Sequence, residues 1–185
     1  MDWNQKLHLV SKGDATPARA ARQIIDSLFL LPCFDLPSGS KILDVGTGAG
    51  YPVIPLKTIR SDLNLVLTES LRKKASYLQD LIEDLRLQET TLFVGRAREL
   101  PKQYNQRFDY ATAKASGELA AVWTEVYAFL KKGGALLTYK GPRVTSELKS
   151  AQRVLKKCPG EITRIQEIKI EELNLGGYLV CVRKK

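Results

Sequence analysis

One segment sets the architecture of this chain: residues 41–56, with the sequence KILDVGTGAGYPVIPL. Its first five residues form a short apolar run typical of a buried strand, and the run ends abruptly in glycines spaced G-x-G-x-G. Residues 52–59 then read as a helix. A glycine turn between a buried strand and a helix is the setting of a nucleotide-binding loop, because glycine adopts positive φ and lets a ligand approach the backbone. The segment therefore predicts a nucleoside-binding site above the first strand.

Outward from this segment, strand and helix patterns alternate along the chain. A first helix begins at Thr16-Pro17, where Thr16 can cap and Pro17 suits the first turn, and Pro32 ends it. Further strands are expected at residues 63–68, 90–94, 108–113 and 135–139, and further helices at 71–87, 119–130 and 145–157. Gly133-Gly134 should end the helix at 119–130. Residues 162–170 and 178–183 fit an antiparallel pair at a sheet edge.

This alternation predicts an α/β, Rossmann-like fold: a seven-stranded, mostly parallel sheet with helices on both faces and an antiparallel edge strand. We expect one domain over residues 1–185, on which residues 1–38 pack as a short helical N-terminal extension. Trp123 lies on an amphipathic helix, so we expect it in the core.

The balance of charge narrows the class of partner. Twenty-nine Lys and Arg against 20 Asp and Glu give a formal net charge of +9. Such a surplus favours an anionic partner, most often nucleic acid, although a solvated basic surface is an equally good interpretation of composition alone. A single histidine, His8, argues against metal clusters and Ser-His or Cys-His catalysis. No apolar run has the ~18 residues of a membrane span, so no membrane association is expected.

The three cysteines, Cys33, Cys158 and Cys181, are far apart and contain no C-x-x-C pair. Neither a disulfide framework nor a zinc site is therefore indicated, and we expect no bound metal. A reducing, cytoplasmic location fits this cysteine usage best.

Two acids indicate which nucleoside the loop takes. A dinucleotide site would show G-x-G-x-x-G, whereas Gly46, Gly48 and Gly50 follow the G-x-G-x-G spacing. Asp44 precedes them, and its charge would oppose a pyrophosphate but can hold the ammonium of adenosylmethionine. Glu69 lies 19 residues after Gly50, where a carboxylate can accept both ribose hydroxyls. Alternatively, Asp44 caps the turn and Glu69 complements a helix N-terminus; all features together favour S-adenosylmethionine.

Several blocks of the chain resemble one family. The segment 41–56, Trp3-Asn4, residues 25–28 (IDSL), residues 69–74 (ESLRKK) and Lys140-Gly141 are similar to blocks of the bacterial RsmG (GidB) family. That family consists of 16S ribosomal RNA guanine-N7 methyltransferases that act in the 530 loop. The resemblance implies the class I fold of adenosylmethionine-dependent methyltransferases, S-adenosylmethionine as cofactor, and 16S ribosomal RNA or the small ribosomal subunit as partner.

The resemblance also implies a set of site residues. Besides Asp44 and the three glycines, the cofactor site would include Tyr51, Glu69, Ser70, Leu71, Ala97, Arg98 and Lys114. Lys114 would be the catalytic residue, contacting the cofactor or the target guanine. It stands where the family has an arginine, and lysine keeps the charge without the planar fork. Arg98 stands where the family commonly has an acid, and the family's Asn-Leu-Thr near the start reads His8-Leu9-Val10 here.

Basic residues near the carboxyl edge of the predicted sheet could hold the RNA: Arg19, Arg22, Arg72, Lys73, Lys74, Lys140 and Arg143. Guanine N7 carries a lone pair and no proton, so alignment rather than a general base would drive transfer. We expect a monomer. Two alternatives remain open: a methyltransferase acting on another substrate, and a non-catalytic module that binds the cofactor or RNA. An NAD dehydrogenase is disfavoured by the glycine spacing and Asp44.

Overall fold

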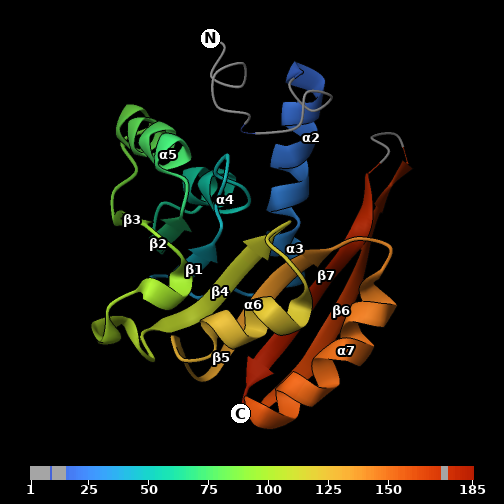
Figure 1. Cartoon of the computed structure of the whole chain (residues 1–185). Helices are drawn as coiled ribbons and strands as arrows, with labels where there is room; N and C mark the ends of the chain where they lie inside the picture. Colours follow the sequence, from blue (N-terminus) through green and yellow to red (C-terminus); the bar gives the residue numbers. More distant parts are fainter. Residues whose placement is uncertain (1–8, 10–15, 172–174) are drawn as a thin grey trace.

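The computed structural model describes residue 9 and residues 16–171 and 175–185. Seven strands form its centre: β1 (Lys41–Val45), β2 (Asn64–Glu69), β3 (Thr90–Val94), β4 (Phe108–Lys114), β5 (Leu130–Lys140), β6 (Gly160–Ile170) and β7 (Leu175–Lys184). They build one sheet in the order β3-β2-β1-β4-β5-β7-β6 (Figure 1). Strands β1 to β5 pair in parallel, and β7 runs antiparallel to both of its neighbours. The predicted sheet is confirmed, with β6 at the edge and the antiparallel strand β7 beside it.

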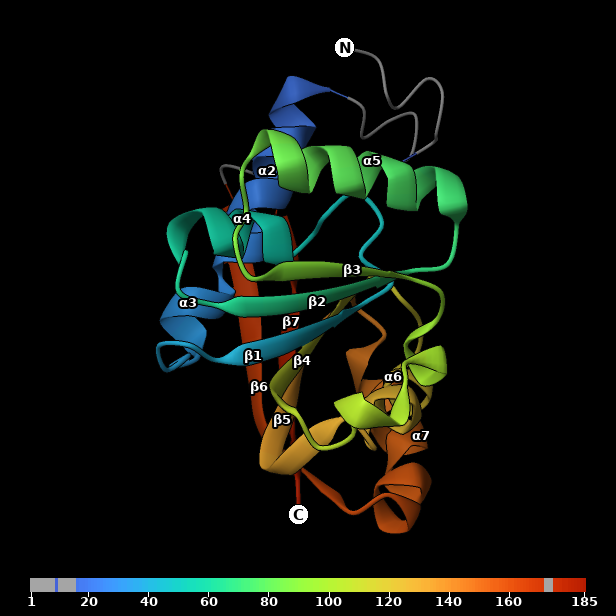
Figure 2. The same ribbon diagram turned by 90° about the vertical axis from the view of Figure 1, so that its left-hand side faces the viewer.

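Helices cover both faces of this sheet (Figure 2). One face carries α2 (Pro17–Leu28), α3 (Leu30–Cys33), α4 (Val53–Ile59) and α5 (Arg72–Asp84), and the other carries α6 (Leu119–Val126) and α7 (Val144–Lys157). Two 3-10 turns, η2 (Ala97–Glu99) and η3 (Lys102–Tyr104), connect β3 to β4. Alternate residues of each strand face the two layers, so the apolar core divides into two clusters.

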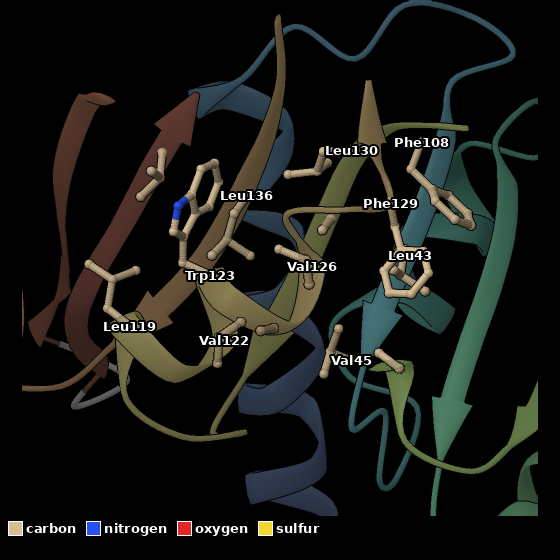
Figure 3. Close-up of a cluster of buried hydrophobic side chains, with 14 of the residues drawn as sticks. Leu43, Val45, Phe108, Leu119, Val122, Trp123, Val126, Phe129, Leu130 and Leu136 are labelled. Carbon is tan, nitrogen blue, oxygen red and sulfur yellow. The ribbon is translucent and has the colours of Figure 1, made fainter. Parts of the chain in front are cut away.

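Trp123 anchors the core on the α6 and α7 face, as expected (Figure 3). Its side chain is fully buried, and the indole Nε1 donates a hydrogen bond of 2.9 Å to the Cys158 carbonyl oxygen. Gly160 lets the backbone pass this ring, because an added Cβ would lie 2.5 Å from Trp123 Cζ2. Full burial of a large apolar side chain stabilises a fold by about 2–3 kcal/mol, so this contact fixes α6 against the last strand pair.

The amino-terminal helix begins as predicted. The Thr16 side chain accepts a hydrogen bond of 3.3 Å from the Arg19 amide, and Pro17 occupies the first turn. Trp3, Asn4, His8 and Val10 lie outside the described residues. Among the residues that are described, no helix has the length and apolar character needed to cross a membrane.

Two predicted helix ends are wrong. Helix α6 ends at Val126, and Gly133-Gly134 lie inside β5 instead of ending a helix. An added Cβ at Gly134 would lie 3.0 Å from the Asp109 carbonyl oxygen, so this glycine serves a close approach between strands. Likewise α2 ends at Leu28, and Pro32 lies within the short helix α3. Both errors arise because a glycine or proline marks a local backbone requirement without showing which element it belongs to.

Candidate active site

The loop after β1 adopts the backbone that its glycines allow. Gly46, Gly48 and Gly50 have φ values of +66°, +60° and +96°. At Gly50 an added Cβ would lie 2.8 Å from Ile54 Cγ1, so α4 packs directly against the loop. At Gly46 it would lie 3.2 Å from Ser116 Cβ, on the loop after β4. The turn therefore closes against two elements and leaves its backbone facing the carboxyl edge of the sheet.

Glu69, at the end of β2, ties this loop to the start of α5. Its Oε2 accepts a hydrogen bond of 3.1 Å from the Gly48 amide, and its Oε1 accepts one of 2.8 Å from the Leu71 amide. The side chain is buried. Each carboxylate oxygen has two lone pairs, so each keeps one for a ligand hydroxyl. Glu69 thus complements a helix start and still retains the acceptors that a ribose would need.

Asp44 is the second buried acid, with 1% of its surface exposed. Its Oδ1 accepts a hydrogen bond of 2.6 Å from Thr112 Oγ1 on β4, whereas its Oδ2 has no partner among the described residues. Burial raises the pKa of Asp44 to about 7, against the opposing effect of the Thr112 and Thr47 hydroxyls beside it. A buried carboxylate oxygen without a hydrogen-bond partner lowers the stability of a fold, unless a bound ligand donates a hydrogen bond to it.

Two further buried polar atoms lack a partner within the described residues: Thr47 Oγ1 and Ser116 Oγ. Together with Asp44 Oδ2 they border the glycine loop. An ammonium and hydroxyl groups are the ligand groups that would satisfy such atoms. The residues present therefore fit adenosylmethionine, which carries both kinds of group.

A cavity of about 170 Å³ opens at this edge. It is lined by Val45, Gly46, Thr68, Ser70, Gly95, Arg96, Ala97, Ser116 and Glu125. Three predicted cofactor residues, Gly46, Ser70 and Ala97, thus come together from three separate loops. The remaining predicted cofactor residues lie outside this lining: Asp44, Gly48, Gly50, Tyr51, Glu69, Leu71, Arg98 and Lys114. Among them Leu71 is 58% exposed. Sequence reasoning missed Ser116 and Glu125, because nothing near them in the sequence marks them as facing the glycine loop.

Lys114, the predicted catalytic residue, lies on the other side of the loop. Its Nζ is 2.7 Å from Asp26 Oδ2 on α2, and it donates a hydrogen bond of 2.7 Å to Gln23 Oε1. The same ammonium lies 5.5 Å from the Tyr51 ring centre and 5.2 Å from the Tyr139 ring centre. Burial lowers the pKa of Lys114, and the Asp26 carboxylate opposes that shift.

Helix α2 is fixed to the site by this pair and by one hydrogen bond. Tyr139 Oη donates to the Ser27 carbonyl oxygen at 2.7 Å, and Ser27 itself is fully buried. The block IDSL was noted in the sequence only as a resemblance. The structure gives Asp26 a place beside Lys114, which an acid within an amphipathic helix could have suggested.

Comparison with known proteins identifies the family. A family model described as rRNA small subunit methyltransferase G matches residues 1–175. The chain belongs to this family. The ribosomal RNA small subunit methyltransferase G of Thermoanaerobacter sp. (strain X514) is 32% identical over 186 residues, covering 100% of this chain and 77% of that protein. The corresponding protein of Clostridium novyi (strain NT) is 32% identical over 185 residues, covering 99% and 76%.

Solved structures confirm the class I methyltransferase fold. A SAM dependent methyltransferase from Aquifex aeolicus superposes with a TM-score of 0.70 at 18% identity, over 94% of this chain and 96% of that one. The M. jannaschii TYW2 structure in complex with AdoMet gives 0.65 at 15% identity, over 91% and 75%. This chain therefore shares its fold with proteins that have little sequence in common with it.

Lys140, one of the residues predicted to hold RNA, does not lie at the protein surface. The Lys140 side chain is only 4% exposed; its Nζ is 2.8 Å from Glu147 Oε2 and donates to the Gly117 carbonyl oxygen at 2.6 Å. Glu147 Oε2 also accepts a hydrogen bond of 2.9 Å from the Leu119 amide. Lys140 therefore anchors the loop after β4 and does not offer its charge to a phosphate.

The other predicted RNA contacts remain at the surface around the carboxyl edge. Arg19 on α2 and Arg143, which caps α7, are exposed, and Arg22 is half-buried. Arg72 and Lys73 are exposed in the first turn of α5, and Lys74 is half-buried beside them. These cations come from α2, α5 and α7, and α5 begins two residues after Ser70, which lines the cofactor cavity.

Proposed function

We propose that this chain transfers the methyl group of S-adenosylmethionine to N7 of a guanine in the 530 loop of 16S ribosomal RNA. Membership of the rRNA small subunit methyltransferase G family supports the reaction and the class of substrate. The observation that carries the proposal is the unpartnered Asp44 Oδ2 beneath the glycine loop, because it is a buried acceptor suited to the cofactor's ammonium.

Adenosylmethionine would supply an activated methyl group on a positively charged sulfur. In this chain Asp44 would hold its ammonium, Glu69 the ribose hydroxyls, and Gly46 the close backbone contact. Glu69 is positioned for this by the Gly48 and Leu71 amides, so its carboxylate cannot rotate freely. The site thereby orients the cofactor before any RNA arrives.

During transfer, a bond forms between guanine N7 and the methyl carbon as the carbon–sulfur bond breaks. N7 has no proton to lose, so the chain needs no general base, and alignment supplies most of the rate enhancement. Lys114 has three N–H donors. Two of them make the 2.7 Å contacts with Asp26 and Gln23, and the third has only a 3.5 Å contact with the Gln23 carbonyl oxygen. That third donor can turn to the cofactor carboxylate or to the target guanine.

The exposed cations around the edge would hold the RNA backbone. Phosphate contacts of this kind release counterions, so the affinity for RNA should fall steeply as salt rises. We also propose that the protein acts as a monomer in the cytoplasm, where its three free cysteines suit a reducing compartment.

The test uses the purified chain, labelled adenosylmethionine and small ribosomal subunits from cells that lack the family enzyme. Label should enter 16S RNA at one guanine, and borohydride reduction followed by aniline should cleave the strand there, because N7-methylation makes the base labile. Binding of adenosylmethionine without any transfer would favour the non-catalytic module. Label in another acceptor, and none in 16S RNA, would overturn the substrate assignment.

A further inference from the structure

Glu125 of α6 is an acid that the cofactor assignment above leaves without a role. It is half-buried and lines the cavity of about 170 Å³ beside Arg96 and Ala97. It also lines an adjoining groove of about 540 Å³ on the outer side of α6, together with Arg96 and Arg98. Glu125 therefore stands at the wall that the cavity and the groove share.

The hydrogen bonding of Glu125 leaves acceptors available. Its Oε1 has a long contact of 3.4 Å with the Arg98 amide. Among the described residues no other hydrogen bond reaches this carboxylate, and neither arginine of the groove forms an ion pair with it. A carboxylate beside a cavity accepts hydrogen bonds only, so it selects ligands that present a donor there.

A second acid, Glu69, lies between the lining residues Thr68 and Ser70 and sets the direction of a bound nucleoside. Glu69 lies at the end of β2, where it retains an acceptor on each oxygen for a ribose. The base of that nucleoside must then extend along the remaining wall, which is formed by Gly95, Arg96, Ala97 and Glu125. Adenine offers an amino group at its six position, whereas hypoxanthine offers a carbonyl oxygen that a carboxylate repels.

From this arrangement we propose that Glu125 recognises the amino group of the cofactor's adenine and thereby selects adenosyl over inosyl ligands. Arg98 cannot take this role, since a guanidinium has donors only. The assignment rests on adenosylmethionine as cofactor and is independent of the RNA substrate. It makes Glu125 a specificity residue of the cofactor site, reached from a helix about 30 residues beyond the loop that carries Ala97.

The test is calorimetric binding of two cofactor products, S-adenosylhomocysteine and S-inosylhomocysteine, to the full chain. Wild type should prefer the adenosyl ligand by roughly 10- to 100-fold, the range for a hydrogen bond to a charged group. Glu125→Gln keeps the shape of the side chain but adds a donor that can turn to the inosyl oxygen. It should reduce the preference to about threefold or less by improving inosyl binding.

A second variant and a control separate recognition from support of the backbone. Glu125→Ala should weaken adenosyl binding about tenfold or more and leave inosyl binding nearly unchanged. Glu83→Gln, on the exposed end of α5, should change neither affinity, because within the described part of the chain the Glu83 side chain hydrogen-bonds to Gln79 alone and lines no part of the cavity. If Glu125 only supports the Arg98 amide, both ligands weaken together and the ratio stays constant. A constant ratio in both variants, or no preference in wild type, overturns the proposal.

Discussion

Two lysines end neighbouring strands, Lys114 on β4 and Lys140 on β5, and their side chains, 12% and 4% exposed, have different roles. In the parallel register Lys114 pairs with Tyr139, so Lys140 lies one residue further and faces the other side of the sheet. Lys114 reaches Asp26 on α2, whereas Lys140 reaches Glu147 on α7. One cation lies between two aromatic rings beside the cofactor loop, and the other holds the loop after β4 to α7.

This difference shows that the role of a basic residue at the carboxyl edge of a sheet can be assigned only when its partner is known. Lys140 gives two of its three N–H donors to Glu147 and to the Gly117 carbonyl oxygen, and its side chain is only 4% exposed, so its charge serves the frame of the fold, which here means the contact between the loop after β4 and α7. Lys114 retains one weakly used donor and stands next to Tyr51, at the mouth of the site. The frame pair, Lys140 with Glu147, and the site pair, Lys114 with Asp26, therefore use the same chemistry for different roles. In each, a largely buried ammonium is paired with a carboxylate.

The largest effect is expected from breaking the frame. Lys140→Met should lower the free energy of unfolding by about 2–3 kcal/mol, because it removes a cation that is only 4% exposed and leaves the Glu147 carboxylate, which is 19% exposed, without its partner. Urea denaturation measures this directly. The double variant Lys140→Met with Glu147→Gln should recover part of the loss, since a neutral amide oxygen still accepts from the Leu119 amide. A loss below about 1 kcal/mol in the single variant would show that the pair adds little to the frame.

The next effect should appear in activity rather than stability. Lys114→Ala should lower methyl transfer by roughly 100-fold, the scale on which misplacement of reacting groups acts. Its unfolding free energy should fall somewhat less than that of Lys140→Met, because the Lys114 side chain is 12% exposed and that of Lys140 only 4%, while the two carboxylate partners are almost equally exposed, at 21% and 19%. Single-turnover rates and urea denaturation on both variants decide the point. Full activity of Lys114→Ala would end its assigned role.

The two lysines also mark what can be predicted from the sequence. The glycine loop, the Thr16 cap and the order of the strands depend on residues close in the chain, so local patterns reveal them. The roles of Lys114 and Lys140 depend instead on their tertiary partners. Lys114 depends on Asp26, which is 88 residues away, and Lys140 depends on which face of α7 carries Glu147. The prediction that Gly133-Gly134 end a helix is wrong for the same reason, because the contact between strands that requires Gly134 is tertiary.

The site lysine should respond to pH through its carboxylate partner. Burial lowers the pKa of Lys114 below its ordinary value, and Asp26 opposes this, so Asp26→Asn should lower the pKa of Lys114 further. The neutral amine would then appear at a lower pH, and the alkaline limb of the kcat/KM profile should move to lower pH. The pKa values of the facing phenols, Tyr51 and Tyr139, are raised by burial, so they stay neutral over this range.

Linkage gives the sign of the accompanying change in stability. A folded-state pKa below the unfolded one means that the native state loses its proton first, so burial of the charged lysine destabilises the fold at neutral pH. Stability contributed by Lys114 therefore rises with pH through the window between the two pKa values, and Asp26→Asn should widen that window. Glu147→Gln is the matched control and should leave the kcat/KM profile in place. A profile that moves equally in both variants would contradict the separation of site from frame.

The smallest effect concerns Tyr139, which pairs with one lysine and precedes the other. Tyr139→Phe removes only the hydrogen bond to the Ser27 carbonyl oxygen, so the free energy of unfolding should fall by about 1 kcal/mol. The ring remains beside Lys114, and methyl transfer should stay near its wild-type rate. Tyr139→Leu also removes the aromatic face and should lower the rate as well as the stability. If Tyr139→Phe lost as much activity as Lys114→Ala, the site would require the packing of α2 against β5 rather than the Lys114 ammonium.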